Sequence, residues 1–326
     1  MHRDLVGRLF DDRTLARLAE LADLDPARVL DDFTTQEAVT SLAEVEVIVS
    51  SWGCPPIDDA VLAAAPRLRA VVHAAGSIKH HITDACWRRG IRVTSAAWAN
   101  ALPVAEYTVA AVLLANKQLL RIREDYRSRR APYDWQSGYR GAGNYRRTVG
   151  IVGASRIGRR VIELLRPHDL DLLLHDPYVD AVEAARLGAR AVGLDELCAA
   201  SDTVSIHAPE LPDTLHLIDR RRLALMRDGA TLINTSRGAL VDQGALEREL
   251  ASGRLDAVLD VTVPEVLPAD SPLYDLPNVV LTPHIAGSLG GELHRMAAAA
   301  VDELARYAGG RPFAHPVLAE DVHRTA

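Results

Sequence analysis

The sequence predicts an α/β protein with two domains, each built on a parallel sheet. Short apolar runs alternate with helical patterns along almost the whole chain, which is typical of parallel sheets covered by helices. The length of 326 residues suits two domains of ordinary size. A glycine-containing turn at 153–158, between a strand pattern and a helix pattern, defines the fold of the second domain more closely than the alternation alone.

Composition excludes several classes of function. The net charge of −7 predicts no general attraction to nucleic acid or to anionic membranes. The cysteines at 54, 86 and 198 lie far apart and form no C-x-x-C pair, so we expect neither a disulfide framework nor a thiolate metal site. No apolar run approaches the ~18 residues that span a bilayer. We therefore expect a cytoplasmic protein.

The first third of the chain contains three strand patterns and the helices between them. The strands are expected at 45–51, 68–75 and 91–96, and the helices at 58–68 and 82–90. A helical pattern at 13–24 precedes the first strand, although α/β domains of this kind normally open with a strand. Either the domain starts with a helix or the natural chain begins upstream of Met1, and we favour the second interpretation.

The second part of the chain opens with a long apolar helix. It is predicted at 103–122, with Pro103 at its start, and its apolar residues lie nearly all round, so we expect it to be buried between domains or subunits. Six strand patterns separated by helices follow, which matches the two mononucleotide-binding halves of a Rossmann sheet. These strands are expected at 148–153, 170–176, 202–208, 230–236, 256–261 and 278–284, before a last helix at 290–310.

The turn after the first of these strands resembles a dinucleotide-binding motif. Gly153 permits the tight turn and Gly158 lets the helix pack on the strand, but Ser155 stands where G-x-G-x-x-G has its middle glycine. Arg156 and Ile157 begin the helix, whose free N–H groups favour phosphate. The Ser155 side chain either weakens nucleotide binding or donates its hydroxyl to a phosphate oxygen.

An acidic residue at the end of the next strand strengthens this interpretation. Asp176 lies 18 residues beyond Gly158, where a carboxylate binds the ribose hydroxyls of the nucleotide, although it could also be a plain turn residue ahead of proline. No arginine follows it to bind a 2′-phosphate, since the next residues are Pro177 and Tyr178. The sequence therefore predicts NAD in preference to NADP.

These motifs, with the segments downstream, resemble the NAD-dependent D-isomer-specific 2-hydroxyacid dehydrogenases. The pieces occur in the family's order over nearly the whole chain, most weakly in the first 40 or so residues. They are "NALPVAEYT", "TVGIVGASRIGRR", "HDPYVD", "VSIHAPELPDTLHLI", "ALMRDGATLINTSRGALVD" and "LDVTVPEVLPADSPLYDLPNVVLTPHIAG". The resemblance implies hydride transfer between NAD(H) and a small 2-hydroxy or 2-keto acid.

The resemblance also implies a catalytic set of Arg237, Glu265 and His284. Each follows a strand at the carboxyl edge of the sheet, where ligands bind in open α/β folds. A guanidinium at Arg237 can hold a carboxylate in fork geometry, and an imidazole at His284 can move the hydroxyl proton. Each of these residues alone could be an ordinary surface charge or the end of a strand, but the three together favour a catalytic site.

Further site residues are carried over by the same resemblance. Near the cofactor it implies Asp260 on the nicotinamide side, with His207, Pro209 and Thr214 in the surrounding loop. In the first domain it implies a turn that binds the substrate carboxylate through backbone N–H groups, and one side chain that bounds the substrate. These residues are Ala75, Gly76, Ser77 and Trp52.

The sequence departs from the family most clearly after Gly76. The stretch "SIKHHI" stands where the family more often shows a "VGVDNI" type of turn. His80 and His81 have no neighbours at metal-ligand spacing, so we predict no metal site and a surface or packing role for them. Lys79 could meet an anionic substrate tail. These differences leave the reaction class intact and the substrate open.

We expect a Rossmann NAD-binding domain at 99–287, inserted in a flavodoxin-like substrate-binding domain made of 1–98 and 288–326. The apolar helix at 103–122 suggests a homodimer. Two alternatives stay open. One is an NAD(H)-sensing binding module of corepressor type with little turnover, and the other is a chain that lost tight cofactor binding through Ser155.

Overall fold

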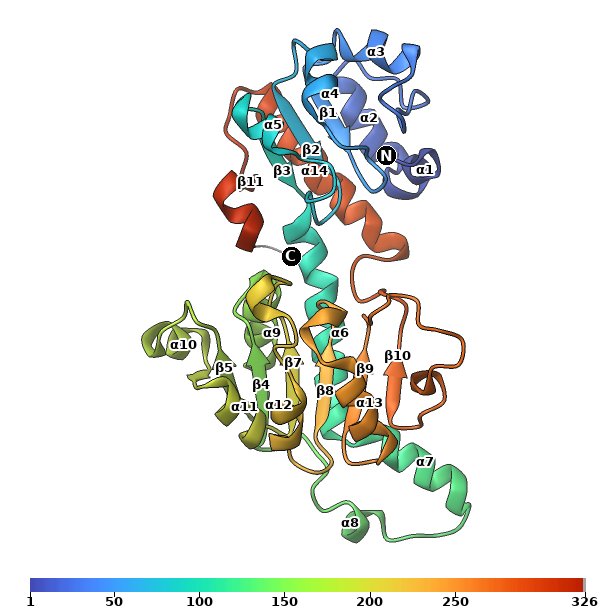
Figure 1. Cartoon of the computed structure of the whole chain (residues 1–326), viewed down its shortest axis with the longest axis vertical. Helices are drawn as coiled ribbons and strands as arrows, with labels where there is room; N and C mark the ends of the chain where they lie inside the picture. Colours follow the sequence, from blue (N-terminus) through green and yellow to red (C-terminus); the bar gives the residue numbers. More distant parts are fainter. Residues whose placement is uncertain (325–326) are drawn as a thin grey trace. The chain divides into compact units, whose positions relative to one another are not determined.

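The computed structural model describes residues 1–324, with side chains described to residue 322. The chain divides into two compact units. Unit 1 contains Met1–Ala101 and the described residues from Ser288 on, and unit 2 is Leu102–Gly287. The last two residues of the predicted range 288–326 lie outside the described residues. Each unit holds one sheet, and the predicted α/β class is confirmed (Figure 1).

Unit 1 contains a sheet in the order β1-β2-β3-β11, in which only the last pairing is antiparallel among the described strands. The chain enters it through helices, and the first strand follows the third of them. The strands are β1 (Val47–Ser50), β2 (Ala70–His73), β3 (Arg92–Ser95) and β11 (Pro316–Val317). The helices are α1 (Val6–Leu9), α2 (Asp12–Leu21), α3 (Gln36–Leu42), α4 (Asp59–Ala64), α5 (Asp84–Arg88) and α14 (Leu293–Ala308).

Helical periodicity explains how the two ends of the chain meet in unit 1. The side chain of Asp11 caps α2 by accepting the N–H of Thr14 at 2.8 Å. Helix α14 buries Leu293, Met296, Ala297, Ala300, Val301 and Leu304, a set spaced three or four residues apart. That apolar stripe packs against Leu9, Phe10 and Leu18 in one core. The described C-terminal residues thus pack in the core of unit 1, as expected if the second domain is inserted in the first.

Unit 2 contains a sheet of parallel strands in the order β10-β9-β8-β7-β4-β5-β6. With β4 taken as the first strand, this is the Rossmann order with β10 added at one edge. The strands are β4 (Arg147–Val152), β5 (Leu170–His175), β6 (Arg190–Ala191), β7 (Thr203–Ile206), β8 (Thr231–Asn234), β9 (Asp256–Leu259) and β10 (Val279–Leu281). The two-residue strand β6 was not predicted, because two residues carry no readable pattern.

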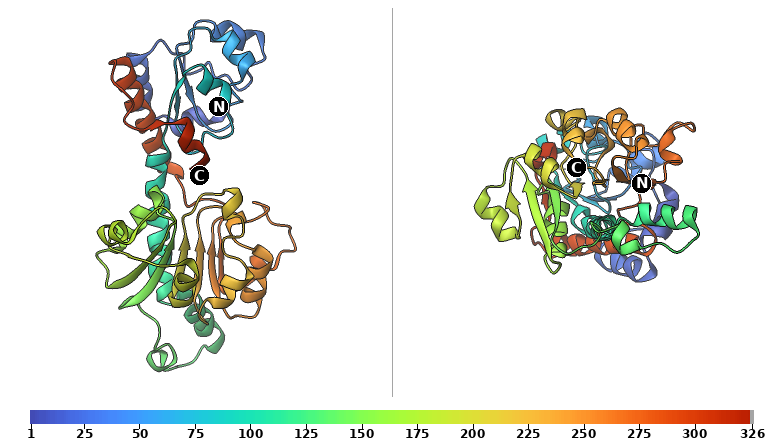
Figure 2. Two further views of the ribbon diagram at one scale, coloured as in Figure 1. Left: turned by 60° about the vertical axis from the view of Figure 1, so that its left-hand side comes forward. Right: turned by 90° about the horizontal axis from the view of Figure 1, so that it is seen from below.

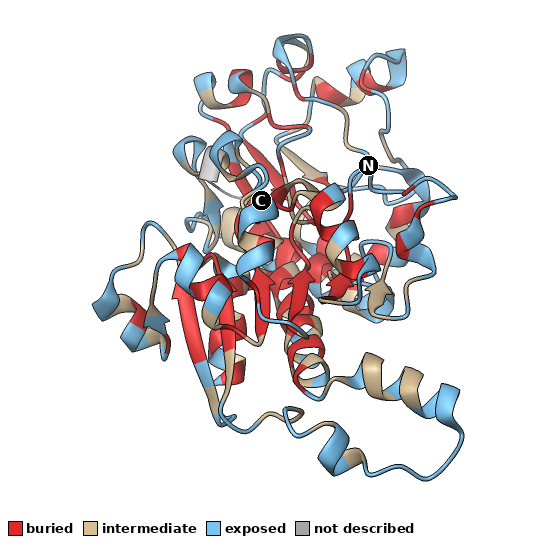
Figure 3. Cartoon of the chain, turned by 60° about the horizontal axis from the view of Figure 1, so that its bottom comes forward, coloured by how far each residue is buried: buried red, intermediate tan, exposed pale blue. Residues whose placement is uncertain are grey.

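Helices connect these strands and cover the sheet. They are α6 (Ala97–Asn116), α7 (Leu119–Arg129), α8 (Trp135–Gly138), α9 (Arg156–Leu165), α10 (Ala181–Leu187), α11 (Leu194–Ala200), α12 (Arg220–Leu225) and α13 (Gln243–Ala251). Figure 2 shows the strands of unit 2 with these helices from two further directions. Strands β7, β8 and β9 are buried along their whole length, as continuous apolar runs in a parallel sheet should be (Figure 3).

The long apolar helix differs from its prediction at both ends. It begins at Ala97, so Pro103 lies inside the helix rather than at its start. It ends at Asn116, whose carbonyl accepts the N–H of Gly143 and whose side chain contacts Thr203 and Asn144. Gln118 then adopts a left-handed φ of 52°, and α7 continues as a separate helix. Tertiary hydrogen bonds at Asn116 therefore override the local helix pattern.

Among the described residues, α6 is the one helix long and apolar enough to cross a membrane by length and composition alone. Such a segment was not expected from the sequence, because no apolar run was found that approaches the ~18 residues that span a bilayer. Part of this apolar surface packs in the core of unit 2, where Ala105 and Val112 contact the sheet around Ile151. Buried core helices of soluble proteins can be equally long and apolar.

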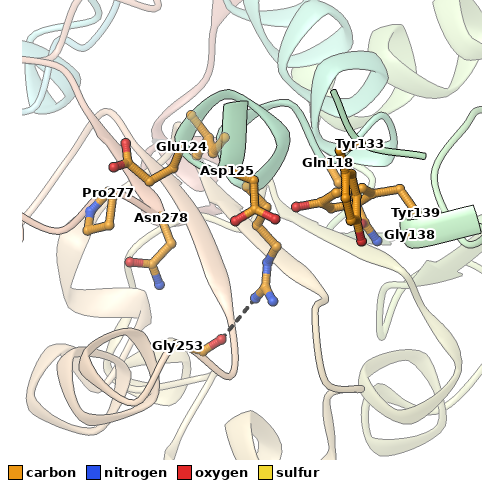
Figure 4. A pocket seen from close by; sticks show the side chains of 11 residues that line it. Gln118, Glu124, Asp125, Tyr133, Gly138, Tyr139, Gly253, Pro277 and Asn278 are labelled. Carbon is orange, nitrogen blue, oxygen red and sulfur yellow. Dashed lines mark hydrogen bonds between the residues drawn. The ribbon is translucent and has the colours of Figure 1, made fainter. Parts of the chain in front are cut away.

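A buried ion pair fixes the start of α7 against the sheet. Arg121 Nε donates to both carboxylate oxygens of Asp256, at 2.9 and 2.8 Å. Its Nη2 donates to the carbonyl of Gly253 at 3.0 Å, and Figure 4 shows this second contact as a dashed line. The Asp256 side chain is only 4% exposed. Burial raises the pKa of Asp256, and the guanidinium opposes that shift. The carboxylate therefore depends on Arg121 to remain charged inside the protein.

We expect Arg121→Ala to destabilise the protein by about 2 kcal/mol at neutral pH, because it leaves a buried carboxylate unpaired. In this variant the folded-state pKa of Asp256 lies further above its unfolded value. Stability is then highest below the unfolded pKa and falls as pH rises through the folded pKa. Urea unfolding from pH 4 to 8 measures this. The double variant Arg121→Ala with Asp256→Asn should lose that pH dependence, and an unchanged slope would contradict the assignment.

Candidate active site

The strand-to-helix turn after β4 is shaped by two glycines. Gly153 has a φ of 99°, and a Cβ there would lie 2.7 Å from the backbone nitrogen of Ala208. A Cβ on Gly158 would collide with the carbonyl oxygen of Gly153. The backbone of the turn thus lies directly against the end of β7, and side chains at these two positions are excluded.

Ser155 is the N-cap of α9. Its hydroxyl oxygen accepts the N–H of Gly158 at 3.3 Å, so it satisfies one of the first-turn donors. Arg156 is exposed and Ile157 half-buried in the same turn. Helix α9 buries positions 158, 161, 162 and 165 against the sheet, which aims its N-terminus along the carboxyl edge of the strands. The serine therefore has a local structural role that the sequence motif did not reveal.

Asp176, at the end of β5, is joined to the glycine turn. One carboxylate oxygen accepts the N–H of Ala154 at 2.7 Å, and the other accepts the N–H of Tyr178 at 2.8 Å. These contacts hold a half-buried carboxylate beside the turn. Each oxygen retains a further lone pair that could accept a hydroxyl.

The end of β7 carries the remaining residues predicted near the cofactor. His207 is buried, and its Nε2 contacts Ser205 Oγ at 2.9 Å. Burial lowers the pKa of His207 to about 3, so the ring is neutral. Its Nδ1 has no hydrogen-bond partner among the described residues. Thr214 Oγ1 donates to the carbonyl of Pro209 at 2.7 Å and accepts the N–H of Leu211, which closes the loop that follows.

The loop after β10 is held by the carboxylate of Asp260. One oxygen accepts the hydroxyl of Thr282 at 2.6 Å and the N–H of Ile285 at 2.8 Å, and the other accepts the N–H of Ala286 at 2.9 Å. The main-chain carbonyl of Asp260 also accepts the N–H of His284 at 2.8 Å. Asp260 is 2% exposed, so these charge-assisted bonds lie inside the protein.

This loop holds His284 in an uncommon backbone conformation. His284 has a φ of 55°, in the left-handed region that a residue with a Cβ seldom occupies. The bonds that Asp260 makes on either side stabilise that conformation. Tyr107 extends the network, because its hydroxyl lies 3.1 Å from Thr282 Oγ1. The sequence did not indicate Tyr107 or Thr282, and hydroxyl residues of this kind carry no signal on their own.

His284 and Glu265 form a direct pair. The Nδ1 atom of His284 lies 2.6 Å from Oε1 of Glu265, which leaves Nε2 for other partners. The loop that carries Glu265 is fixed by Gln243, whose side chain bonds both the N–H and the carbonyl of Val263 at 2.9 Å. Thr262 Oγ1 donates to the carbonyl of Pro264 within the same loop. Gln243 was not indicated by any of the sequence motifs.

Arg237 lies in the turn after β8. Its Nη1 donates to the carbonyl of Ser236 at 2.7 Å, and its own carbonyl accepts from the side chain of Asn234 at 2.8 Å. Gly238 follows, and a Cβ at that position would collide with the backbone of Thr262. The arginine turn and the loop before Glu265 are therefore in close contact at the same edge of the sheet.

The residues predicted to bind substrate lie in unit 1. Ala75, Gly76 and Ser77 follow β2 at its carboxyl end, with Ala75 buried and the other two half-buried. Trp52 follows β1 and is 41% exposed. Among the residues that the structure describes, no group of three or more His, Cys, Asp or Glu side chains could hold a metal ion.

Comparison with known proteins identifies the family. The model of the NAD binding domain of D-isomer specific 2-hydroxyacid dehydrogenases matches residues 109–286. The chain belongs to this family. It is 36% identical over 268 residues to glyoxylate/hydroxypyruvate reductase B of Pectobacterium carotovorum, covering 81% of this chain and 82% of that protein. The resemblance predicted from the sequence motifs is therefore confirmed.

Two further relatives illustrate the range of the family. D-3-phosphoglycerate dehydrogenase of Mycobacterium bovis is 33% identical over 273 residues, which are 83% of this chain and 51% of that protein. The chain thus spans about half the length of the curated phosphoglycerate dehydrogenases that it matches. The apo structure of D-mandelate dehydrogenase from Rhodotorula graminis superposes with a TM-score of 0.78 at 25% identity, covering 96% of this chain and 95% of the other.

We expect Asp260→Asn to lower the free energy of unfolding by about 2 kcal/mol, because the amide has one acceptor oxygen and its NH₂ group opposes an N–H donor of the loop. Amide exchange at Ile285 and Ala286 should accelerate. Urea unfolding and hydrogen exchange measure the two effects. Asp270→Asn, an exposed carboxylate in the preceding segment, is the matched control. Equal exchange rates in both variants would show that Asp260 does not hold the loop.

Proposed function

We propose that the protein is an NAD(H)-dependent oxidoreductase that interconverts a D-2-hydroxy acid and the corresponding 2-keto acid. The contact between His284 and Glu265 at 2.6 Å, on a loop held by Asp260, is the observation that carries the proposal. Membership of the family supports NAD-linked hydride transfer on acids of this class. The identity of the acid is left to experiment.

In this proposal His284 is the general acid and base. Its Nδ1 is engaged by Glu265, so Nε2 is the atom that gives a proton to the carbonyl oxygen in reduction and removes the hydroxyl proton in oxidation. The carboxylate of Glu265 binds Nδ1 and thereby orients the ring. Arg237 binds the substrate carboxylate and polarises the neighbouring carbonyl through its fork of N–H donors.

The turn after β4 fits a dinucleotide. The close approach at Gly153 leaves the backbone uncovered, and the α9 N-terminus supplies N–H groups and a partial positive charge for the pyrophosphate. The N-cap hydroxyl of Ser155 keeps this terminus in place. NAD, when bound, supplies the hydride acceptor and donor. His207, Pro209, Thr214 and Asp260 are proposed to line the same cofactor site.

Asp176 supports a preference for NAD over NADP. Its carboxylate, fixed by Ala154 and Tyr178, can accept the ribose hydroxyls but would repel a 2′-phosphate. In unit 1 we assign the substrate carboxylate to the backbone N–H groups of 75–77 and a boundary role to Trp52. A cytoplasmic location is also proposed, since all three cysteines are free thiols.

We further propose that the protein forms a homodimer through α6 and α7. An apolar cavity of about 220 Å³ lies on this surface, lined by Tyr107, Ala111 and Leu114 among others. Leu114 is 50% exposed and Leu119 is 43% exposed, although both are large apolar side chains. Among the described residues, none of those in α7 is buried, and Tyr126 of α7, Tyr133 and Trp135 form an aromatic cluster between α7 and α8. A second copy of the chain would cover this surface.

Light scattering after size exclusion should give twice the mass of 35.4 kDa for the wild type. Leu114→Glu places a charge on the apolar surface and should shift the protein toward monomer. Val182→Glu, at an exposed apolar residue of α10, is the control. A wild-type monomer at working concentration would refute the dimer.

The experiment that tests the proposed activity is NADH oxidation by the purified protein over a panel of small 2-keto acids, repeated with NADPH. We expect turnover with NADH, at least a hundredfold loss in His284→Ala, and a smaller loss in Glu265→Gln, which keeps a hydrogen-bond acceptor but removes the charge. His294→Ala, a histidine of α14 in unit 1, controls for the loss of an imidazole elsewhere.

The possible outcomes separate the candidate functions. Turnover that survives in His284→Ala would reject the proposed acid–base role. NADH binding without turnover on any acid would favour an NAD(H)-sensing module over an enzyme. The absence of NADH binding would reject both the enzyme and the NAD(H)-sensing module. It would indicate that Ser155, in the turn after β4, prevents tight cofactor binding.

A further inference from the structure

Unit 1 contains a cluster of three buried polar side chains that the proposed reaction does not use. Ser50, His73 and His81 are 1%, 2% and 3% exposed. Ser50 is the last residue of β1, and His73, its partner in register, is the last residue of β2. His81 lies on the turn that follows β2. All three therefore meet at the carboxyl end of the two strands.

The three side chains share one hydroxyl. Ser50 Oγ lies 2.9 Å from Nδ1 of His73 and 3.3 Å from Nε2 of His81. The two rings are 4.3 Å apart between centroids and tilted by 39°. Because a hydroxyl has one proton, Ser50 can donate to at most one imidazole, so at least one ring donates its N–H to Ser50 Oγ. The tautomers of the two rings are thereby coupled, and the cluster acts as one unit.

Both imidazoles are neutral at physiological pH. Burial, and then the neighbouring His81, hold the pKa of His73 well below its usual range. Burial also lowers the pKa of His81 to about 4, with smaller effects in the same direction from the Met1 ammonium and from His80. Neutral hydrogen bonds can hold a fixed geometry here without the desolvation penalty of a buried ion.

The cluster lies directly against the turn that carries Ala75, Gly76 and Ser77. On one side of this turn, Ala74 donates its N–H to the carbonyl of Ser50 at 2.7 Å. On the other side, His81 accepts the N–H of Ile57 at 2.8 Å through its own carbonyl. The start of the turn is therefore bonded to the backbone of Ser50, and the backbone of His81, four residues beyond Ser77, is anchored to Ile57.

A third link reaches the turn itself. The backbone of Ser77 acts on the His73 ring in the direction that raises its pKa, opposite to burial. The Nε2 atom of His73 has no partner with full hydrogen-bond geometry among the described residues, so this ring is the least satisfied member of the cluster. The His73 ring is therefore the member of the cluster that interacts with the backbone of the turn.

We propose that Ser50, His73 and His81 are positioning residues that hold the 75–77 turn in the conformation that binds the substrate carboxylate. This inference rests on the proposed function and deepens it, because it assigns control of substrate affinity to side chains that do not touch the substrate. Backbone N–H groups bind an anion well only when they already point toward it. The cluster provides that orientation.

The consequence is a separation of kinetic constants. The carboxylate contact is made in the ground state and is retained in the transition state, so its loss raises KM and leaves kcat almost unchanged. The groups proposed to move the proton and bind NAD belong to unit 2 and should be unaffected. A general loss of structure would instead lower the fraction of active protein and hence kcat.

Matched variants of His81 test the network. Glutamine can place an amide group near the position of the imidazole Nε2 and still hydrogen-bond Ser50, whereas leucine fills the space without a polar group. His80→Leu makes the same replacement at the exposed neighbouring residue. Should His81→Leu fail to fold, His81→Asn takes its place, because its shorter side chain does not reach Ser50. Ser50→Ala removes the shared hydroxyl.

The measurements are KM and kcat with the best keto acid from the panel, the Kd for NADH, and hydrogen exchange of the 71–82 segment. We expect about a tenfold increase in KM for His81→Leu and Ser50→Ala, which is equivalent to about 1.4 kcal/mol of substrate binding. In both variants kcat should change less than about threefold, and the Kd for NADH should not change. Amide exchange at 75–77 should accelerate in both. His81→Gln should recover most of the wild-type KM, and His80→Leu should match wild type.

Two results would overturn the inference. One is wild-type KM and wild-type exchange in His81→Leu and Ser50→Ala. The other is a fall in kcat that His81→Gln does not rescue, which would indicate a merely structural role. Failure of the proposed function is distinguishable, because it appears as a lack of turnover in the wild type, whereas the hydrogen-exchange comparison still decides whether the cluster holds the turn.

Discussion

The hydrogen bonds that the Asp260 carboxylate accepts from the loop after β10 are the constraint on which the candidate active site depends. The pair between His284 and Glu265 is itself solvent-exposed, with side chains 41% and 67% exposed, and exposed ion pairs contribute little free energy. Such a contact does not determine where the imidazole lies. Its position comes from the backbone, because the N–H groups of Ile285 and Ala286 bind a carboxylate that solvent does not reach. The left-handed conformation of His284 is maintained by the same bonds.

The turn after β4 is constrained in a different way, by the absence of side chains at Gly153 and Gly158. The backbone at Gly153 packs against the end of β7, and Gly158 packs against the turn itself, so the helix begins as close to the sheet as the main chain allows. Ser155 is compatible with this arrangement because its φ of −62° and ψ of 177° are open to any residue. Its hydroxyl caps the helix. Ser155 thus adds a capping hydroxyl to the turn in a backbone conformation that any residue can adopt.

The strands, their parallel order and the family could be predicted because continuous apolar runs and the motifs between them are local signals. The ends of α6 could not, since Asn116 ends the helix through contacts with Gly143, Asn144 and Thr203, which are far away in the sequence. His81 was expected to have a surface or packing role, and only the register of β1 against β2 brings it to Ser50 and His73. Contacts of this kind arise from topology, which residue patterns do not encode. The roles of Arg237, Glu265 and His284 stay predictions that geometry supports.

The two units use opposite physical means to hold their functional groups. In unit 2 a charged carboxylate is buried and saturated by backbone donors, which gives a rigid loop that presents an exposed, titratable imidazole. In unit 1 the buried groups are neutral imidazoles and a hydroxyl, which lack a net charge and so would not compete with an anion at the N–H groups of the turn that is proposed to bind the substrate. A buried cation there would attract the substrate carboxylate away from the turn, and a buried anion would repel it. Neutral hydrogen bonds are therefore suited to orient the turn that is proposed to bind an anion, whereas a charge is suited to hold the loop that carries the proposed acid and base.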